Sequence, residues 1–465
     1  MENKHTLTDL YQMQALPLSA KIRMTKYRIR QWIEEYGEDG VYVSFSGGKD
    51  STVLLHLVRE DYPNVPAMFV DVPTQYTELR DFVKTFDNVD IVKPKMSFME
   101  VCRKYGFPLI SKEVSESVYG AKRYLTSILN SGMLDRQTDR QPYKYYYEKV
   151  TGTGKYSKFP FFPSNADIIE KAHMEAIRRG KDTNISTKYH TCLEQIDNVA
   201  IKNPTRGGTT ENIEECEELA NFLNKKMKNK EGGNNRRLAI MLGMLSKNKD
   251  NPIKANIPNE DKSQFSQEKY KFLLEAPFDV SNRCCTVMKK NPAHEYHKKT
   301  GRNPITATMA SESRLRTQKW LQNGCNGFNL RIPTSNPMSF WTEQDVLLYI
   351  KLYNIPICSV YGDVVIDYEA EGSVDGQMDL SELSADYGLF ETGNRPLKTT
   401  GCNRTGCVLC GFGCHLEKPG EGRFERLKET HPGMYKLLDV IENNGVTYRE
   451  AIDWINEHGN MNIKY

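Results

Sequence analysis

The chain carries near its N-terminus the stretch Val41-Tyr42-Val43-Ser44-Phe45-Ser46-Gly47-Gly48-Lys49-Asp50-Ser51-Thr52-Val53-Leu54-Leu55. The pattern predicts a buried strand, a tight turn at the two glycines, and the start of an apolar helix. Such a turn aims backbone N–H groups and a helix N-terminus at one point, which attracts a phosphate group. The stretch therefore predicts a nucleotide-binding site at the end of a strand.

The residues of this turn narrow the chemistry. Two adjacent glycines let the backbone approach an anion without a Cβ clash, Lys49 adds a point charge, and Ser46 and Ser51 add hydroxyl donors. The spacing is neither that of the P-loop, which has four residues before its Gly-Lys pair, nor that of the G-x-G-x-x-G dinucleotide turn. The alternative is an ordinary strand-to-helix turn, which has no need for these polar side chains.

Strands and helices alternate before and after a long middle segment. We expect helices over 18–36, 77–86, 98–105 and 341–353, strands over 67–72 and 89–92, and two helical pieces within 432–458 separated by Gly445. This order predicts an α/β fold, a doubly wound parallel sheet with helices on both faces. Ligands in such sheets bind at the carboxyl ends of the strands, where Ser46 and Asp71 would lie.

We divide the chain into five predicted parts. They are the N-terminal half of a nucleotide-binding α/β domain (1–114), a mostly helical insertion (115–277), the second half of the α/β domain (278–360), an acidic loop or hairpin (361–396), and a cysteine-rich loop with C-terminal helices (397–465). The acidic part holds nine Asp or Glu residues and no Lys or Arg between positions 363 and 391. Its charge would repel phosphate, so we expect it to face away from the substrate.

Part of the insertion is strongly basic. Residues 221–249 carry eight Lys or Arg side chains against one acid, Glu231. One interpretation is a surface for a nucleic acid backbone or bases, so DNA or RNA is a candidate partner. The other is a solvated surface with incidental lysines.

Composition limits the possible classes of protein. The net charge of the 465 residues is only +3, so no global field demands nucleic acid. No apolar run approaches 18 residues, and the N-terminal residues are polar, so the sequence predicts neither a membrane span nor a signal peptide. Eleven cysteines, an odd number and mostly clustered, fit a reducing cytosol and a metal site rather than a disulfide scaffold. We therefore expect a cytoplasmic protein, of undetermined oligomeric state.

Four motifs carry a resemblance to a known superfamily. Ser46-Gly47-Gly48-Lys49-Asp50-Ser51 resembles the pyrophosphate loop of the PP-loop ATP pyrophosphatases. The segment 284–292 is similar to the Cys-Cys-x-x-x-Lys-x-x-Pro motif of their phosphoadenosine-phosphosulfate reductase-like branch. Residues 305–316 resemble the strand and arginine motif that follows, and 407–410 match the Cys-x-x-Cys of the iron–sulfur members. The resemblance covers residues 20–115 and 278–440.

The resemblance implies an adenine nucleotide alpha hydrolase-like fold and cleavage of ATP between its α and β phosphates. ATP and Mg²⁺ are the expected ligands, with Lys49 and Asp50 acting in catalysis. The expected nucleotide-binding residues are Ser44, Ser46, Gly47, Gly48, Lys49, Asp50, Ser51, Thr52, Asp71, Arg314 and Arg316. For Asp71 the alternative is a plain cap at a strand end, and for the two arginines it is a surface salt bridge.

The clustered cysteines predict a metal centre. Sulfur-only ligand sets suit a [4Fe–4S] cluster or structural zinc, and the missing second Cys-x-x-Cys of a zinc ribbon makes zinc the weaker choice. The Cys-Cys pair together with a distant Cys-x-x-Cys resembles the cluster pattern of the iron–sulfur reductases in this family, and free or redox-active thiols are the third alternative. The expected ligands are Cys285, Cys402, Cys407 and Cys410, and the sequence leaves open which of Cys284, Cys285 and Cys402 stays outside the ligand set. A surplus thiol such as Cys284 would carry sulfur in catalysis, and Cys414 is either a further member or a bystander.

Three functions follow from these features. The leading one is an ATP-dependent sulfurtransferase that adenylates an acceptor, as in the iron–sulfur DNA-phosphorothioation sulfurtransferases; this resemblance also implies a cysteine desulfurase as sulfur donor. The second is reduction of an adenylylated sulfate, although the intact Lys49 loop and the absence of cysteine from residues 448–465 weigh against it. The third is a non-catalytic nucleic-acid-binding component.

Overall fold

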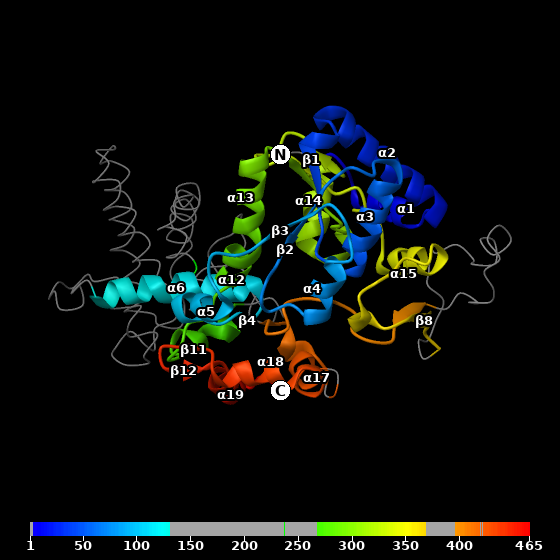
Figure 1. Ribbon diagram of the computed structural model, residues 1–465. Coiled ribbons are helices and arrows are strands. Elements are labelled where there is room, and N and C mark those ends of the chain that lie inside the picture. Colours follow the sequence, from blue (N-terminus) through cyan, green and yellow to red (C-terminus); the bar gives the residue numbers. More distant parts are fainter. Residues whose placement is uncertain (1–2, 131–236, 238–266, 369–395, 419, 421) are drawn as a thin grey trace, which may run out of the picture. The chain divides into compact units, whose positions relative to one another are not determined.

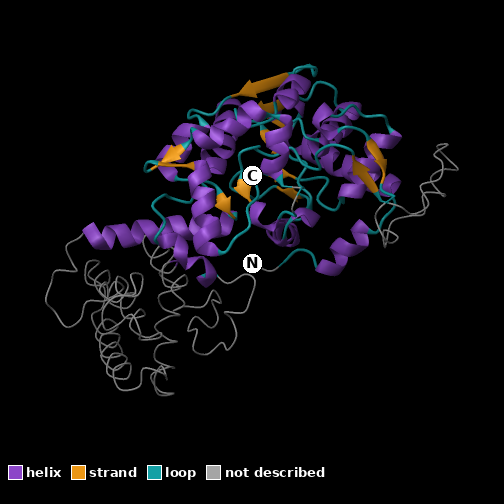
Figure 2. Ribbon diagram, turned by 90° about the horizontal axis from the view of Figure 1, so that it is seen from below, coloured by secondary structure: helices purple, strands orange, loops and turns teal. Residues whose placement is uncertain are grey.

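The computed structural model describes residues 3–130, 237, 267–368, 396–418, 420 and 422–465 (Figure 1). Most of the predicted insertion and of the acidic stretch 363–391 lies outside these residues. The described part is mainly helical, and its strands are only two to four residues long (Figure 2). The chain forms two compact units: Met1–Phe98 with Cys285–Leu409, and Met99–Cys284 with Cys410–Tyr465.

A six-stranded sheet lies in the first unit, in the order β3-β2-β1-β5-β7-β6. Its strands are β1 (Val41–Ser44), β2 (Ala67–Val70), β3 (Val89–Val92), β5 (Asn303–Ile305), β6 (Asn326–Gly327) and β7 (Thr334–Ser335). Every neighbouring pair is parallel except β6 and β7, which are antiparallel. The predicted α/β fold with a mostly parallel sheet is confirmed.

Both faces of the central strands are covered. Tyr42 of β1 and Met68 of β2 pack with Tyr296 of helix α13 (Asn291–Thr300). Side chains alternate along a strand, so Val41 and Val43 point to the other face, and both are fully buried. Helix α3 (Lys49–Asp61) contacts β1 and packs against α2 (Leu18–Tyr36) and α15 (Glu343–Leu352). Two buried faces explain why β1 reads as a continuous apolar run.

The remaining elements of the first unit are short. They are α1 (Leu7–Gln14), α4 (Thr77–Val83), α14 (Arg314–Asn323), and the antiparallel pair β8 (Val364–Ile366) and β9 (Leu397–Thr399). The predicted strand 89–92 and helix 18–36 have the predicted bounds, whereas β2 and α4 end two and three residues earlier than predicted. Strand β8 begins within the predicted acidic hairpin.

Helix α15 begins two residues after the predicted start at 341, with Thr342 as its N-cap. The Thr342 hydroxyl accepts a hydrogen bond from the Asp345 N–H, and the Asp345 carboxylate accepts one from the Thr342 N–H at 2.7 Å. This capping box satisfies two N-terminal donors of the helix. The same carboxylate pairs with Lys21 of α2 at 2.7 Å, and both side chains are almost fully buried. The N-terminus of α15 is therefore held by a cap and a buried ion pair.

The second unit is built around aromatic packing. Its helices are α5 (Phe98–Tyr105), α6 (Lys112–Asn130), α17 (Arg423–Thr430), α18 (Pro432–Tyr435) and α19 (Tyr448–Gly459), with the parallel pair β4 (Leu109–Ile110) and β10 (Gly411–Phe412). The rings of Phe107 and Tyr448 stack with centroids 4.8 Å apart. Helix α5 has the predicted bounds.

Gly445 separates two helical pieces, as predicted, and it does so within a hairpin that was not predicted. The hairpin joins β11 (Glu442–Asn443) and β12 (Val446–Thr447). Asn444 and Gly445 both have positive φ, 54° and 80°. An Asn-Gly pair with two positive φ angles forms the turn that suits the twist of a two-residue hairpin.

Candidate nucleotide site

The two glycines of the loop are required for different reasons. Gly47 has a φ of +72°, and a Cβ there would lie 2.8 Å from the Val83 Cγ2 atom. At Gly48 a Cβ would lie 3.2 Å from oxygen atoms of Ser46, Tyr361 and Thr405. Position 47 thus needs the left-handed freedom of glycine, and position 48 needs a bare backbone that neighbouring hydroxyl groups can approach.

Hydroxyl groups hold the loop in shape. The Ser51 Oγ atom accepts from the Ser46 N–H at 3.1 Å and donates to the Gly48 carbonyl at 2.9 Å. Thr52 donates to the same carbonyl at 3.1 Å. Ser44 ends strand β1, directly before the loop. The structure thus brings the predicted residues 44–52 together at the carboxyl end of β1, the edge at which ligands bind in sheets of this kind.

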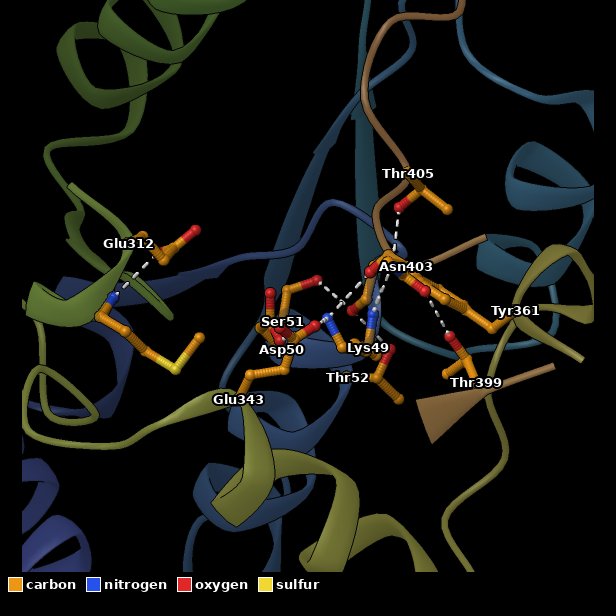
Figure 3. A network of polar contacts seen from close by, with 12 residues as sticks. Lys49, Asp50, Ser51, Thr52, Glu312, Glu343, Tyr361, Thr399, Asn403 and Thr405 are labelled. Carbon is orange, nitrogen blue, oxygen red and sulfur yellow. Dashed lines mark hydrogen bonds and ion pairs between the residues drawn. The ribbon is translucent and has the colours of Figure 1, made fainter. Parts of the chain in front are cut away.

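Lys49 lies at the centre of a polar network (Figure 3). Its side chain is only 3 % exposed, and its Nζ atom lies 3.0 Å from Glu343 Oε1 and 3.4 Å from Asp50 Oδ1. It also donates to the Asn403 carbonyl at 3.2 Å. Burial by itself disfavours the charged amine, but the Asp50 and Glu343 carboxylates outweigh it and raise the pKa of Lys49. Lys49 is therefore a positive charge at neutral pH.

The segment that carries Cys402 and Cys407 is attached to this loop. The Tyr361 hydroxyl accepts from the Lys49 N–H at 3.2 Å and lies 2.7 Å from the Thr405 Oγ1 atom (Figure 3). The backbone also holds the segment, because Cys402 N–H donates to the Val360 carbonyl at 2.9 Å. Further along, the Val408 N–H donates to the Thr74 carbonyl at 2.8 Å. Residues 399–409, which we call the cysteine segment, therefore pack directly on the glycine loop.

A cavity of about 220 Å³ opens beside Lys49. Its lining residues are Lys49, Asp50, Met309, Ser311, Glu312, Thr342, Glu343 and Arg404. Pockets for drug-sized ligands usually measure about 300–1,000 Å³, so this cavity is smaller than a site for a whole nucleotide but has room for phosphate groups. Two cations and three carboxylates line it, so a divalent cation bound to the phosphates would offset the excess negative charge.

The two predicted arginines differ in their surroundings. Arg316 forms an ion pair with Glu312, one of the cavity residues. Burial lowers the pKa of Arg316, the positive charge of Arg404 lowers it further, and Asp50 opposes both. Arg316 therefore lies in the electrostatic field of the cavity. Arg314 begins helix α14 and is exposed.

Asp71 follows strand β2 directly, at the predicted edge of the sheet. Its two oxygens face the Arg80 guanidinium, with Oδ1 at 2.6 Å from Nε and Oδ2 at 2.9 Å from Nη2. This bidentate pair neutralises the carboxylate. A role of Asp71 toward Mg²⁺ or the nucleotide remains a prediction, and it would require Arg80 to share the carboxylate.

The six clustered cysteines divide between the two units. Cys285, Cys402 and Cys407 belong to the first, and Cys284, Cys410 and Cys414 to the second. In the second unit the Cys414 thiol contacts the Cys410 carbonyl at 3.5 Å, and burial raises its pKa. Arg423 donates to the same carbonyl. Within the described ranges no group of three or more His, Cys, Asp or Glu side chains is arranged to hold a metal ion, so the predicted ligand set remains a prediction.

Comparison with known proteins assigns a family. The model of the phosphoadenosine phosphosulfate reductase domain matches residues 40–108 and 241–411, just over half of the chain. The chain belongs to this family. The match includes the glycine loop, the Cys284-Cys285 pair, the arginine motif and the Cys-x-x-Cys, and family membership makes the protein a nucleotide-using enzyme connected with sulfur chemistry. No curated protein and no solved structure matches the chain.

No helix among the described residues is long and apolar enough to cross a membrane.

Four residues of the site are not singled out by the sequence. They are Glu343, Tyr361, Asn403 and Arg404. The capping box of α15 places Glu343 at the first turn of a helix, but it does not indicate what that helix faces. Asn403 and Arg404 stand between cysteines, where the sequence presents them only as spacers.

Proposed function

We propose that this protein is an ATP-dependent sulfurtransferase. It binds ATP with Mg²⁺ at the glycine loop, adenylates an acceptor with release of pyrophosphate, and exchanges the adenylate for sulfur. The observation that carries the proposal is the attachment of the cysteine segment to the loop through Tyr361, Asn403 and Thr405. The glycine loop and three of the proposed cluster ligands, Cys285, Cys402 and Cys407, thus belong to one compact unit, whereas Cys284 and Cys410 belong to the other.

The first step is a displacement at the α phosphorus. An oxygen of the acceptor attacks phosphorus, the bond from the α phosphorus to its bridging oxygen breaks, and pyrophosphate leaves with the electron pair. Charge develops on the phosphate oxygens, so a positive charge fixed in advance at Lys49 stabilises the transition state. The hydroxyl groups of Ser46 and Ser51 and the first backbone N–H groups of α3 are the proposed additional donors.

The second step replaces AMP by sulfur. With hydrosulfide as nucleophile, a bond forms between sulfur and the acceptor atom, the bond to the adenylate oxygen breaks, and AMP departs. If a cysteine desulfurase delivers the sulfur as a persulfide on Cys284, the remaining S–S bond must be cleaved by a thiol reductant that supplies two electrons. The acceptor is a nucleic acid or a smaller molecule, and the basic residues 221–249 favour DNA or RNA.

The iron–sulfur cluster is part of the proposal on the cysteine pattern alone. Cys285, Cys402, Cys407 and Cys410 would hold it, and thiolate ligation is the chemistry that such clusters require. Iron and sulfide analysis after anaerobic purification tests this directly. About four irons and four sulfides per chain would support a [4Fe–4S] cluster, and zinc in their place would exclude it.

Pyrophosphate release tests the function. We expect the protein to release pyrophosphate from Mg·ATP when DNA, tRNA or a small acceptor is present, and mass spectrometry to find sulfur in the product. Lys49→Met should lower the rate at least about 100-fold, because it removes the fixed charge. Lys95→Met is the matched control, since Lys95 forms an exposed pair with Glu295. Absence of pyrophosphate with every acceptor would overturn the proposal.

Reduction of an adenylylated sulfate is the second candidate. The family model that matches is itself that of a reductase domain, and it favours this activity independently of the loop. Supplying adenylyl sulfate or its 3′-phosphorylated form with a thiol reductant separates the two. Sulfite without pyrophosphate release from ATP would assign the reductase, and neither product would favour a non-catalytic nucleic-acid-binding component.

A further inference from the structure

Arg404 is the cation of the cysteine segment that faces the cavity. It lies two residues after Cys402 and lines the same 220 Å³ cavity as Lys49 and Asp50. The position is set by its neighbours on both sides, because the Asn403 carbonyl accepts from Lys49 and the Thr405 hydroxyl contacts Tyr361. A guanidinium held at this point can reach a group bound at the glycine loop.

Among the described residues, no carboxylate forms an ion pair with Arg404. Lys49 is paired with Glu343 and Asp50, and Arg316 is paired with Glu312. The Arg404 side chain is exposed. Its positive charge also acts on the Arg316 guanidinium, whose pKa it helps to lower after burial. Two positively charged guanidinium groups repel each other, and an anion bound beside Arg404 would relieve the repulsion.

We propose that Arg404 binds the phosphate chain of the nucleotide and thereby couples nucleotide binding to the position of the cysteine segment. The proposal rests on the proposed function only in taking ATP as the ligand. Guanidinium groups bind phosphate through two parallel hydrogen bonds, and the cavity of about 220 Å³ has room for phosphate groups. Coupling between two sites is reciprocal, so a nucleotide that engages Arg404 orders residues 399–409.

Nucleotide binding to the full chain tests the assignment. We expect Arg404→Gln to weaken Mg·ATP binding about tenfold or more, the usual effect of losing a charge-assisted hydrogen bond. Adenosine, which lacks phosphate, should bind the variant and the unchanged protein equally. Arg404→Lys keeps the charge without the fork and should fall between them. The matched control is Arg331→Gln, which removes an exposed arginine outside the cavity lining.

Hydrogen exchange provides a second readout that a merely structural role would not move. Mg·ATP should slow amide exchange in residues 399–409 of the unchanged protein, and Arg404→Gln should lose this protection even at saturating ATP. The proposal is overturned if Arg404→Gln binds ATP within twofold of the unchanged protein, or if it weakens adenosine as much as ATP. If the unchanged protein binds no ATP, the proposed function fails instead, and the inference falls with it. Arg404→Lys serves as the test variant if Arg404→Gln does not fold.

Discussion

Replacement of Glu343 by glutamine should tighten ATP binding. The Glu343 carboxylate is paired with Lys49, with Nζ and Oε1 3.0 Å apart, and Lys49 is the proposed contact of the phosphate. A bound phosphate must share Lys49 with this carboxylate and would meet its negative charge. The isosteric amide keeps the shape and can still accept from Lys49, but it no longer repels the phosphate. We therefore expect a lower dissociation constant for Mg·ATP in Glu343→Gln.

The size of the effect follows from distance and exposure. Two unit charges 3 Å apart interact by about 5 kcal/mol at an effective dielectric constant of about 20. The Glu343 side chain is 43 % exposed, so solvent screening and the entropy lost in holding the pair reduce the net interaction free energy of Glu343 with Lys49 to about 1 kcal/mol. That corresponds to roughly fivefold tighter binding. Because one partner is exposed, salt should diminish the difference between the two proteins.

Isothermal titration calorimetry at about 0.1 M and 0.5 M salt measures both effects. Glu60→Gln is the control, because Glu60 forms a comparable pair with Lys26 at 3.0 Å and its side chain is 46 % exposed. It should leave ATP binding unchanged. If Glu343→Gln instead weakens binding fivefold, Glu343 holds the metal or the nucleotide and does not compete with it. An unchanged dissociation constant would equally refute the competition.

Three further predictions concern the framework of the site. Lys21→Met should lower the free energy of unfolding by about 3 kcal/mol in chemical denaturation, because it leaves the buried Asp345 carboxylate without its cation. Lys26→Met, which removes a more exposed pair, should lower the free energy of unfolding by less than about 1 kcal/mol in the same assay. Gly47→Ala should abolish nucleotide binding, as measured by calorimetry. Gly301 is the control, because its φ is +71° and no atom lies within 4 Å of a new Cβ. Gly301→Ala should lose only about 1–2 kcal/mol of stability and should still bind the nucleotide. Burial lowers the pKa of His56 and of His415 below the ordinary value of 6.5. The contribution of these neutral side chains to the stability of the fold is therefore complete above pH 6.5 and is lost as the pH falls toward the lowered pKa values. His56→Gln should flatten the decline of the melting temperature below pH 6.5, and an unchanged decline would contradict this assignment.

Local patterns predicted most of the framework of the first unit. The strand, glycine turn and helix around Gly47 follow from a short apolar run and two residues without Cβ. The start of α15 follows from the capping box of Thr342 and Asp345. These features depend on residues at most five positions apart in the chain, so they can be predicted from a short stretch of sequence.

The partners of Lys49 could not be predicted in the same way. Its contacts with Tyr361 and Asn403 join residues 312 and 354 positions apart. Such pairs depend on the order of strands in the sheet, where β5 lies beside β1 although more than 250 residues separate them. Pairing over that distance carries no signature in local periodicity. The Asn444-Gly445 hairpin, by contrast, did carry a local signal, but the sequence analysis predicted only the separation of two helical pieces at Gly445.

Through the buried ion pair of Lys21 with Asp345, the N-terminal part of the chain helps to hold the helix that carries Glu343. Helix α15 presents Glu343 to the cavity from its first turn, and the ammonium group that steadies that turn comes from the N-terminal helix α2. A shortened version that starts at the glycine loop would leave the Asp345 carboxylate, in the first turn of α15, without the Lys21 cation. Fragments designed for crystallisation or labelling should therefore retain Leu18–Tyr36, even though no residue of that helix touches the cavity.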